Sequence, residues 1–286
     1  MIIDKSKKIL IIGLGLIGGS YGMALKRKGY SVSAITLDKE SIDYAIKNNI
    51  IDKGSCEVDE SLINEADIIV FALYPHTFIE WIKNYGHLIK KGTVITDVTG
   101  VKGCVVYEIQ SLLPEGVEFI AAHPMAGREK SGVENSDDSV FHNANYIVVP
   151  TEKNSFSAIE LCKSLGEELG FASVSVLPPE RHDEMIAFLS QLTHCIAVSL
   201  MCACDDPNLE RYTGDSFRDL TRIAIINDEM WSELFLSNSE KLLSQMDAYR
   251  KAFDKLYDSI KNADREEMRS MMRISSERRQ NFNKKA

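Results

Sequence analysis

The pattern that most constrains the fold lies in the first 29 residues. Four apolar residues at 9–12 precede glycines at positions 13, 15 and 18, spaced G-x-G-x-x-G, and a helical stretch then runs to Gly29. A buried strand, a glycine turn and a helix in this order are typical of dinucleotide-binding folds. The first glycine permits the tight turn, the second lets a pyrophosphate approach the backbone, and the third lets helix and strand pack closely.

The start of this helix adds an electrostatic reason for the same ligand. Its first N–H groups have no partner within the helix, and the helix dipole is positive at this end, so it attracts phosphate. We therefore predict a bound dinucleotide rather than an empty turn between strand and helix. The predicted cofactor-binding residues of the turn are Gly13, Leu14, Gly15, Leu16, Ile17 and Gly18.

Six more strand-like segments follow, at residues 31–36, 68–72, 94–97, 119–122, 146–149 and 173–176. Strands that alternate with helices at this spacing predict an α/β fold with a Rossmann-type, doubly wound and mainly parallel sheet. Ligands of such sheets bind beyond the carboxyl ends of the strands. Leu73, Asp97, Thr99 and His123 lie at such ends, and we predict that Leu73 lines the cofactor site.

The choice between NAD and NADP depends on the end of the second strand. A dinucleotide-binding fold usually ends this strand with an acid that binds the ribose 2′-hydroxyl. Here Thr36 stands at the end of the strand, and the acid, Asp38, comes two residues later. Asp38 can reach the ribose from the loop, whereas Thr36 and Lys39 can accommodate a 2′-phosphate. Both alternatives stay open, and we favour NAD.

The pattern changes after residue 178. From there to the end no strand is predicted; a long helix spans residues 180–204, Ser216 caps a helix over 217–226, and Asp264 caps the last helix. We therefore predict a dinucleotide-binding domain at residues 1–178 and a helical substrate and dimerisation domain at residues 179–286.

The helix between those two caps carries an apolar seam that predicts a homodimer. Its apolar residues are spaced 4-3-4-3-4: Leu242, Met246, Tyr249, Phe253, Leu256 and Ile260. A seam of this kind packs against another helix, and a helical interface shared by two subunits would bury it.

Composition excludes several classes of protein. The net charge of −9 argues against a nucleic-acid partner, which favours a basic surface. The six cysteines show no CxxC pair and no metal-ligand spacing, so we expect reduced thiols and no metal. The longest uncharged run, residues 9–25, is the glycine motif itself, and no other segment is expected to span a membrane. We therefore expect a cytoplasmic protein.

Three further stretches combine polar residues with a fixed order and spacing. They are H-P-M-A-G at residues 123–127 with Glu129 and Gly132, His182-Asp183 followed by S-Q-L-T-H at residues 190–194, and F-R-D-L-T-R-I-A at residues 217–224 followed by Met230-Trp231. Together with the glycine motif they resemble the prephenate/arogenate dehydrogenase family of tyrosine biosynthesis. The resemblance covers essentially the whole chain.

This resemblance implies a reaction and an architecture. The reaction is the oxidative decarboxylation of prephenate to 4-hydroxyphenylpyruvate, or of arogenate to tyrosine, with hydride transfer to NAD or NADP. The architecture is a Rossmann domain followed by a helical dimerisation domain, in agreement with the predicted strands and helices. No residue distinguishes prephenate from arogenate, which differ in a keto or an amino group on the side chain.

The resemblance also implies roles for individual residues. His123 matches the general base that takes the proton of the substrate's C4 hydroxyl, a step suited to an imidazole, whose ordinary pKa is about 6.5. Arg222 matches a residue that binds a substrate carboxylate. His194, Glu129 and Trp231 match residues in or beside the substrate pocket.

One position departs from the family's pattern. The family often has a serine in the turn after the strand at residues 94–97, where it helps to hold the catalytic histidine and the substrate hydroxyl. Gly100 stands at this position, preceded by Thr99. Either Thr99 supplies the hydroxyl as a catalytic group, or the role is lost. We interpret His182 and Asp183 as a capping pair that orients a helix.

Two other functions are alternatives. A reductase of the β-hydroxyacid dehydrogenase or imine reductase type would have a catalytic lysine on the first long helix of its second domain, and residues 180–204 contain no lysine. A non-catalytic dinucleotide sensor would use the helical half to contact a partner. Such a sensor would not need histidine and arginine side chains at the ends of strands and helices that face one cleft.

Overall fold

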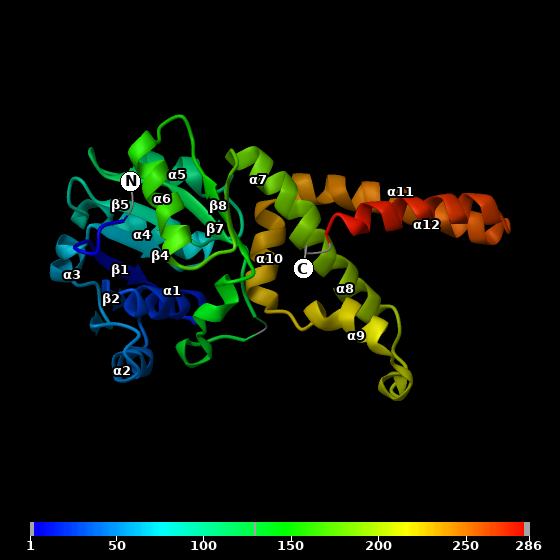
Figure 1. Cartoon of the computed structure of the whole chain (residues 1–286), viewed down its shortest axis with the longest axis horizontal. Helices are drawn as coiled ribbons and strands as arrows, with labels where there is room; N and C mark the ends of the chain where they lie inside the picture. The colour runs from blue at the N-terminus through cyan, green and yellow to red at the C-terminus, as the bar shows by residue number, and fades with distance from the viewer. Residues whose placement is uncertain (1–2, 129, 283–286) are drawn as a thin grey trace. The chain divides into compact units, whose positions relative to one another are not determined.

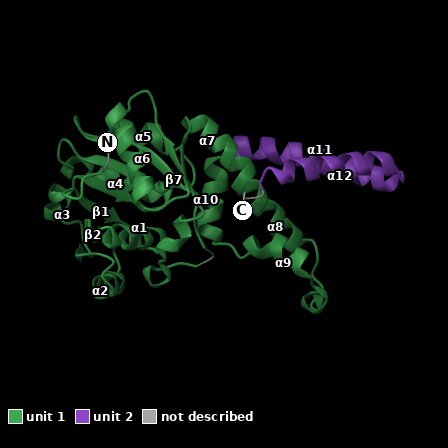
Figure 2. Cartoon of the chain, viewed as in Figure 1, with its two compact units in different colours: residues 1–238 green, residues 239–286 purple. Residues whose placement is uncertain are grey.

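The computed structural model describes residues 3–128 and 130–282, so Glu129 lies outside the described residues. The chain divides into two compact units, Met1–Asn238 and Ser239–Ala286 (Figure 2). The first unit joins the strands to the first helices of the predicted helical domain. The predicted boundary at residue 178 follows a change of secondary structure and stays a prediction.

A six-stranded parallel sheet forms the centre of the first unit (Figure 1). Its strands are β1 (Lys8–Ile12), β2 (Ser31–Ile35), β3 (Lys53–Ser55), β4 (Ile68–Phe71), β5 (Val94–Asp97) and β6 (Glu118–Phe119). The strand order is β3-β2-β1-β4-β5-β6, which confirms the predicted doubly wound fold. The order reverses between β1 and β4, and ligands of such sheets bind at the carboxyl ends next to this reversal.

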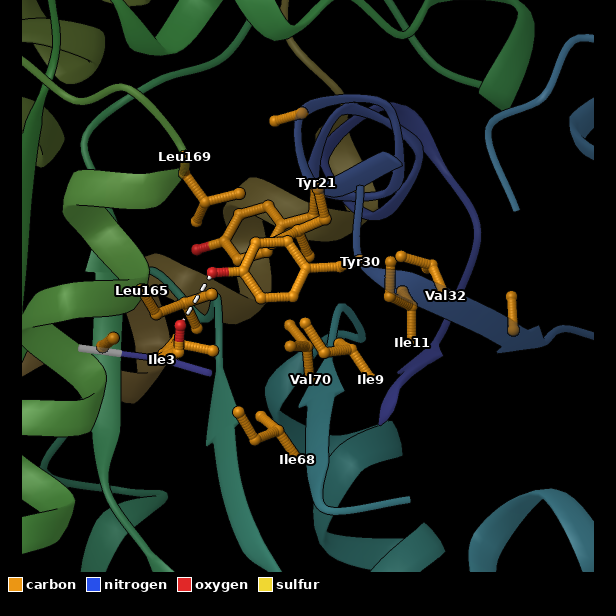
Figure 3. Close-up of a cluster of buried hydrophobic side chains, with 14 of the residues drawn as sticks. Ile3, Ile9, Ile11, Tyr21, Tyr30, Val32, Ile68, Val70, Leu165 and Leu169 are labelled. Carbon is orange, nitrogen blue, oxygen red and sulfur yellow. Dashed lines mark hydrogen bonds between the residues drawn. The ribbon is translucent and has the colours of Figure 1, made fainter. Parts of the chain in front are cut away.

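Helices cover both faces of the sheet, because alternate side chains of each buried strand point to opposite sides. Ile9 and Ile11 pack in one cluster with residues of α1 (Leu16–Arg27) and α6 (Phe156–Glu168), part of which Figure 3 shows. Leu10 and Ile12 pack in a second cluster with residues of α3 (Glu60–Glu65), α4 (Pro75–Tyr85) and α5 (Val106–Leu112). The continuous apolar run of β1 is thus explained by contacts on both faces.

A second sheet, of order β7-β8-β9, follows β6. β7 (Ala121–Pro124) runs antiparallel to β8 (Asn145–Val149), and β9 (Ser173–Val176) runs parallel to β8. The sequence predicts one strand over residues 119–122, but the structure divides it at Ile120, whose N–H still bonds to the carbonyl of Ile95. Beyond that point the N–H of Ala122 donates to the side chain of Asp97. The chain therefore leaves the first sheet immediately before His123.

A long helical segment follows β9, as predicted. It consists of α7 (Pro179–Ile186), a π-helical turn η4 (Ala187–Leu192) and α8 (Thr193–Cys202). The next helix, α9 (Asp215–Thr221), is shorter than predicted, because a 3₁₀ turn η6 (Arg222–Ala224) follows it. Its N-cap is Gly214, so the predicted cap at Ser216 is wrong. The sequence analysis did not predict α10 (Asp228–Ser237), which the side chain of Asn227 caps.

The segment Pro179–Cys202 corrects one prediction from composition. By length and composition it is apolar enough to cross a membrane, with a mean hydropathy of 1.7, whereas the sequence analysis expected no such segment outside the glycine motif. Ile186, Ala187 and Ala197 are nevertheless buried within the first unit. Only 28% of its most apolar 18-residue stretch is buried, so burial within this unit accounts for only part of its apolar composition.

The second unit is a hairpin of two helices, α11 (Ser239–Lys261) and α12 (Arg265–Gln280) (Figure 2). The side chain of Asp264 accepts a hydrogen bond from the N–H of Glu267, which confirms the predicted cap of the last helix. Within the predicted seam of α11, Leu242 is buried, but four residues are between 39% and 61% exposed: Met246, Tyr249, Phe253 and Ile260. An exposed apolar row of this kind indicates an interaction surface.

Candidate active site

The glycine turn between β1 and α1 has the backbone that the sequence pattern predicts. Gly13 has a φ of +94°, and a Cβ there would lie 2.4 Å from the carbonyl oxygen of Ala72. A Cβ at Gly18 would lie 2.1 Å from the carbonyl oxygen of Gly13. At Gly15, in contrast, apart from its neighbours in the chain, no atom of the described residues lies within 4 Å of the Cβ position. The turn is therefore closely packed at Gly13 and Gly18 and open at Gly15.

The open side at Gly15 fits the pyrophosphate of a dinucleotide. Gly15 is the N-cap of α1, and no side chain caps this helix, so its first N–H groups face the space beside Gly15. Phosphate oxygens readily accept hydrogen bonds from such groups. Leu73 lies against the same turn, because one of its methyl carbons would be 2.8 Å from a Cβ at Gly13.

The loop after β2 carries the residues on which the choice of NAD or NADP depends. Thr36 directly follows the strand. Asp38 is the N-cap of α2 (Lys39–Lys47), and its carboxylate accepts hydrogen bonds from the N–H groups of Glu40 and Ser41 and from the hydroxyl of Ser41. The hydroxyl and N–H of Ser41 lower the pKa of Asp38. Both oxygens of this carboxylate are thus used within the protein.

A buried ion pair lies between the carboxyl end of β5 and Ala122 of β7. Asp97 and Lys102 are 0% exposed, and the ammonium lies 2.7 Å from the carboxylate. Asp97 accepts from the N–H of Ala122 at 3.1 Å, and Lys102 donates to the carbonyl of Ala122 at 2.6 Å. In a sheet these two backbone groups would bond to a neighbouring strand. The ion pair therefore takes the place of a strand and fixes the backbone one residue before His123.

Thr99 belongs to this buried cluster. Its hydroxyl donates to the carboxylate of Asp97 and accepts from the ammonium of Lys102 at 3.1 Å, and the residue is 3% exposed. Within the described part of the chain, no hydrogen bond joins Thr99 to His123. The structure thus places Thr99 where it supports the strand end, and a catalytic role for its hydroxyl stays a prediction.

Hydrogen bonds join His123 to two residues of α7. Nδ1 of His123 lies 2.9 Å from Nε2 of His182, and Nδ1 of His182 lies 2.7 Å from Oδ1 of Asp183. The carboxylate of Asp183 also accepts from the N–H groups of Lys102 and Gly103, at 2.9 and 2.8 Å. The interpretation of His182 and Asp183 as a capping pair is wrong, because no side chain caps α7.

Burial keeps both histidines neutral at neutral pH. It lowers the pKa of His123 well below its ordinary value of 6.5, and the His182 ring and the Lys102 cation lower it further. Burial also lowers the pKa of His182, against the opposing effect of the hydrogen bond to Asp183. For Asp183 burial raises the pKa, but hydrogen bonds from His182 and the backbone outweigh it, so the carboxylate is ionised.

His194 and Trp231, which the resemblance assigns to the substrate pocket or beside it, lie together. Their rings stack, with centroids 3.7 Å apart and planes inclined by 30°, and Nδ1 of His194 donates to the carbonyl of Ser190 at 2.8 Å. The turn η6, which carries Arg222, packs against α8, the helix of His194. Arg222 also borders an open cavity of about 720 Å³ between the end of α8 and α9. The fourth predicted substrate residue, Glu129, lies outside the described residues.

The π-helical turn η4 decides which side of the helix His194 occupies. His182 and His194 are twelve positions apart, which in an uninterrupted α-helix, at about 100° per residue, would place them roughly 120° apart around the axis. A π turn accommodates one extra residue, so this angle falls to roughly 20°. The two histidines therefore lie on one face of the helix, the face that carries His182 to His123.

Two parts of the site were missed by the sequence reasoning. Lys102 does have a sequence signal: it lies among Val101, Val105 and Val106, and a lone lysine among apolar residues after a buried strand indicates a buried ion pair. The contact between His182 and His123 has no local signal, because 59 positions separate the two residues.

The fold and the strand-end histidine define a class of protein: two-part dehydrogenases that bind a nicotinamide dinucleotide at a parallel sheet and use a helical second half. Two family models match the chain, the nucleotide-binding domain of prephenate dehydrogenase over residues 21–175 and its dimerization domain over residues 178–274. The chain belongs to the prephenate dehydrogenase family and is an oxidoreductase.

Individual relatives match most of the chain. The prephenate dehydrogenase of Bacillus subtilis is 32% identical over 270 residues, which cover 91% of this chain and 72% of that protein. The solved structure of prephenate dehydrogenase from Aquifex aeolicus with hydroxyphenyl propionate and NAD+ has a TM-score of 0.88 and 30% identity, covering 97% of this chain and 98% of that chain. The Synechocystis arogenate dehydrogenase has a TM-score of 0.82 and 25% identity, covering 96% and 100%.

Proposed function

We propose that the chain oxidatively decarboxylates prephenate to 4-hydroxyphenylpyruvate, or arogenate to tyrosine, in tyrosine biosynthesis. The observation that carries the proposal is the neutral imidazole of His123 at the end of β7, whose Nε2 has no hydrogen-bond partner among the described residues. Such a nitrogen is placed to accept a proton from a substrate beside a nicotinamide. Family membership and the likeness to an arogenate dehydrogenase support these two substrates.

The residues of the site account for the proton in this reaction. A dinucleotide held at the turn of Gly13, Gly15 and Gly18 would supply a nicotinamide ring as the acceptor for the hydride on ring carbon C4 of the substrate. Nε2 of His123 takes the proton of the C4 hydroxyl as the C4–O bond gains carbonyl character. The bond from C1 to its carboxylate then breaks, carbon dioxide leaves, and the electron pair of that bond completes the aromatic ring. His123 returns the proton to the C4 oxygen, so the product is a phenol.

The test is the formation of reduced nicotinamide with prephenate or arogenate, each with NAD or NADP. His123→Asn keeps a hydrogen-bonding side chain but cannot take the proton, so kcat should fall roughly 10²- to 10⁴-fold with little change in KM. The exposed His87 offers a matched control, His87→Asn, which should keep the parent's kcat. An inactive parent, or a His123→Asn variant with most of the parent's kcat, would refute the proposal.

Substrate binding is assigned to the residues around α8. The planar guanidinium of Arg222 suits a substrate carboxylate, because it donates two parallel hydrogen bonds. His194, held by its stacking on Trp231, lines the pocket for the ring; Glu129, which the resemblance also assigns to this pocket, lies outside the described residues. The packing of η6 against α8 and the stacked rings support this assignment.

For the cofactor we propose that the site accepts NADP as well as NAD, which changes the preference expected from the sequence. The supporting observation is that both carboxylate oxygens of Asp38 cap α2, while Thr36 occupies the usual place of the ribose-binding acid. Because Thr36 and not an acid stands at the end of the strand, no carboxylate at that position would repel a 2′-phosphate.

Two substitutions test this cofactor proposal. Thr36→Asp should raise KM for NADP strongly and lower it for NAD, because it restores the acid. Asp38→Asn keeps a good N-cap and removes the charge, so it should leave the ratio of the two KM values unchanged. A strong rise of KM for NAD in Asp38→Asn would show that Asp38 binds the ribose and would contradict the proposal.

We also propose a homodimer that forms through the helical half, in the cytoplasm. The match to a dimerization domain and the exposed apolar residues of α11 support the dimer, and six free cysteines support a reducing compartment. Phe253→Glu should dissociate the dimer in light scattering, because Phe253 is 57% exposed within the seam. Phe156→Glu, at a residue that is 78% exposed on α6, is the matched control and should stay dimeric. A monomeric parent would contradict the dimer.

A further inference from the structure

His182 and Asp183 form the part of the site that the proposed mechanism leaves unexplained. They are 0% and 2% exposed, neither caps a helix, and their hydrogen bonds lead to the base. We propose that they are positioning residues: Asp183 sets the tautomer of His182, and His182 sets the tautomer of His123, so that Nε2 of His123 is the proton acceptor. The catalytic consequence rests on the proposed function, but the proton positions do not.

The proton positions follow from the acceptor at the end of this hydrogen-bonded chain. An ionised carboxylate only accepts, so Nδ1 of His182, 2.7 Å from Asp183, carries a proton and donates it. A neutral imidazole with its proton on Nδ1 has its lone pair on Nε2. Nε2 of His182 therefore accepts from Nδ1 of His123 at 2.9 Å. His123 in turn has its lone pair on Nε2, the atom left for a substrate.

Asp183 itself is held in one orientation. The N–H of Lys102 bonds to its Oδ1 and the N–H of Gly103 to its Oδ2, and backbone donors cannot rotate away. The backbone of Asp183 is also held, because the side chain of Asn238 donates a hydrogen bond to its carbonyl at 3.0 Å. A purely structural link between α7 and this turn would need only the carboxylate. The histidine between Asp183 and His123 adds a second buried polar side chain, and both of its ring nitrogens are hydrogen-bonded, one to each of these residues.

The charges around His123 give the arrangement a second effect. When His123 takes a proton, it becomes a cation close to the buried ammonium of Lys102, which opposes that step. The carboxylate of Asp97, 2.7 Å from the ammonium of Lys102, offsets the charge of that cation. The carboxylate of Asp183, joined to His123 through His182, offsets the charge of the protonated His123. Two buried carboxylates thus face two cations in the protonated state, and buried charges are tolerated when they are paired in this way.

Nitrogen-15 NMR of the imidazole rings tests the proton positions without substrate. The two neutral tautomers differ in their nitrogen shifts, and the chain has six histidines, so single substitutions can assign the signals. At neutral pH we expect His123 and His182 to have their proton on Nδ1. Asp183→Ala removes the acceptor of the His182 Nδ1 proton, so both rings should lose their preference for the tautomer with the proton on Nδ1. A parent spectrum with His123 protonated on Nε2 would overturn the proposal at any level of activity.

Kinetics of the full-length chain test the consequence for catalysis. In His182→Phe an aromatic ring remains but cannot accept the His123 proton, and Asp183→Asn keeps the side-chain shape. In each, kcat should fall roughly 10²- to 10⁴-fold with little change in KM, because neither residue touches the substrate. His182→Gln offers a carbonyl to His123 and an amide donor to Asp183, so it should regain part of this loss.

Asn238→Ala is the matched control. It removes two buried hydrogen bonds, one to the backbone of Asp183 and one to the side chain of Gln191, but leaves the three side chains of the proton chain intact. It should lower the free energy of unfolding and leave the pH profile of kcat unchanged. If it shifts that profile as much as Asp183→Asn does, general loosening of α7 explains the effect and the proposal fails.

The remaining outcomes separate this proposal from the proposed function. A parent that oxidises neither prephenate nor arogenate refutes the proposed function, and the NMR spectrum still decides the tautomers. An active parent in which His182→Phe keeps its kcat makes His182 structural and overturns the proposal. If His182→Phe does not fold, His182→Gln and Asp183→Asn decide: the proposal requires a much smaller loss of kcat in the first than in the second.

Discussion

The buried pair of Lys102 and Asp97 leads to a strong prediction for the stability of Lys102→Met. Methionine is of similar size and apolar, so the change removes the ammonium and leaves little cavity. The carboxylate of Asp97 then stays buried without its cation, and the carbonyl of Ala122 loses its donor. Removing one partner of a buried ion pair costs about 3–5 kcal/mol, because the other charge remains buried.

That cost is large beside the total stability of a domain, about 5–15 kcal/mol. In a unit of about 150–250 residues each kcal/mol lowers Tm by about 2–4 °C, so we expect a decrease of roughly 6–20 °C. Lys83→Met is the matched control: Lys83 is 42% exposed, and its ion pairs with Glu80 and Glu108 lie on the surface. Exposed pairs contribute about 0–1 kcal/mol, so the control should unfold within a few degrees of the parent.

A second variant, Asp97→Asn in the Lys102→Met background, separates the lost cation from lost packing. Neutralising both partners leaves no buried charge, so the double variant should be more stable than Lys102→Met alone. Urea unfolding followed by circular dichroism gives the four free energies of unfolding of the double-mutant cycle, and equal m-values confirm a comparable transition. Additive effects of the two substitutions, or a Lys102→Met variant with the parent's Tm, would refute the reasoning.

Three further predictions concern the cofactor turn, the substrate arginine and the histidines. Gly15→Ala should keep the parent's stability and weaken binding of the reduced dinucleotide in fluorescence titration, whereas Gly18→Ala should lower the free energy of unfolding, because its Cβ would meet the carbonyl of Gly13 at 2.1 Å. Arg222→Ala should raise KM far more than it lowers kcat, by roughly 30- to 1000-fold for a charge-assisted contact of about 2–4 kcal/mol; an unchanged KM would place the substrate arginine elsewhere. Because the pKa values of His123 and His182 are lowered in the folded chain, the unfolded chain binds more protons below about pH 6.5. The free energy of unfolding should therefore fall on acidification, by up to about 1.4 kcal/mol per pH unit for each histidine, and a stability independent of pH between about 7 and 5.5 would contradict this.

The cofactor turn and the sheet could be predicted from the sequence because local backbone requirements define them. The φ of +94° at Gly13 and the close contact at Gly18 exclude larger residues, so the glycine spacing carries the geometry directly. Apolar runs of four or five residues then identify buried parallel strands. Asp38 shows the limit of this approach, because a shift of two residues decides whether an acid ends a strand or caps the next helix.

The support behind His123 could not be predicted, because it joins residues that are distant in the chain. Lys102, in a turn after β5, binds the carbonyl of Ala122, and His182, in α7, contacts His123 itself; neither contact follows from periodicity. The sequence analysis assigned His182 and Asp183 to the commoner local role of helix capping. Only the fold brings α7 beside the turn whose backbone N–H groups, at Lys102 and Gly103, bind Asp183.

The π-helical turn η4 shows why helical periodicity alone misplaces His194. At 3.6 residues per turn His182 and His194 belong to different faces of the helix, so the sequence pattern does not group them. The turn brings them to one face, and it also holds the ring, because the carbonyl of Ser190 within the turn accepts from Nδ1 of His194 at 2.8 Å. Gln191, in the same turn, donates to the carbonyl of Leu234 at 2.7 Å and so ties the turn to α10. The π-helical turn therefore both moves His194 around the helix axis and fixes the orientation of its ring. A substitution at His194 removes the ring but leaves the π-helical turn, and hence the position of residue 194 around the axis, unchanged.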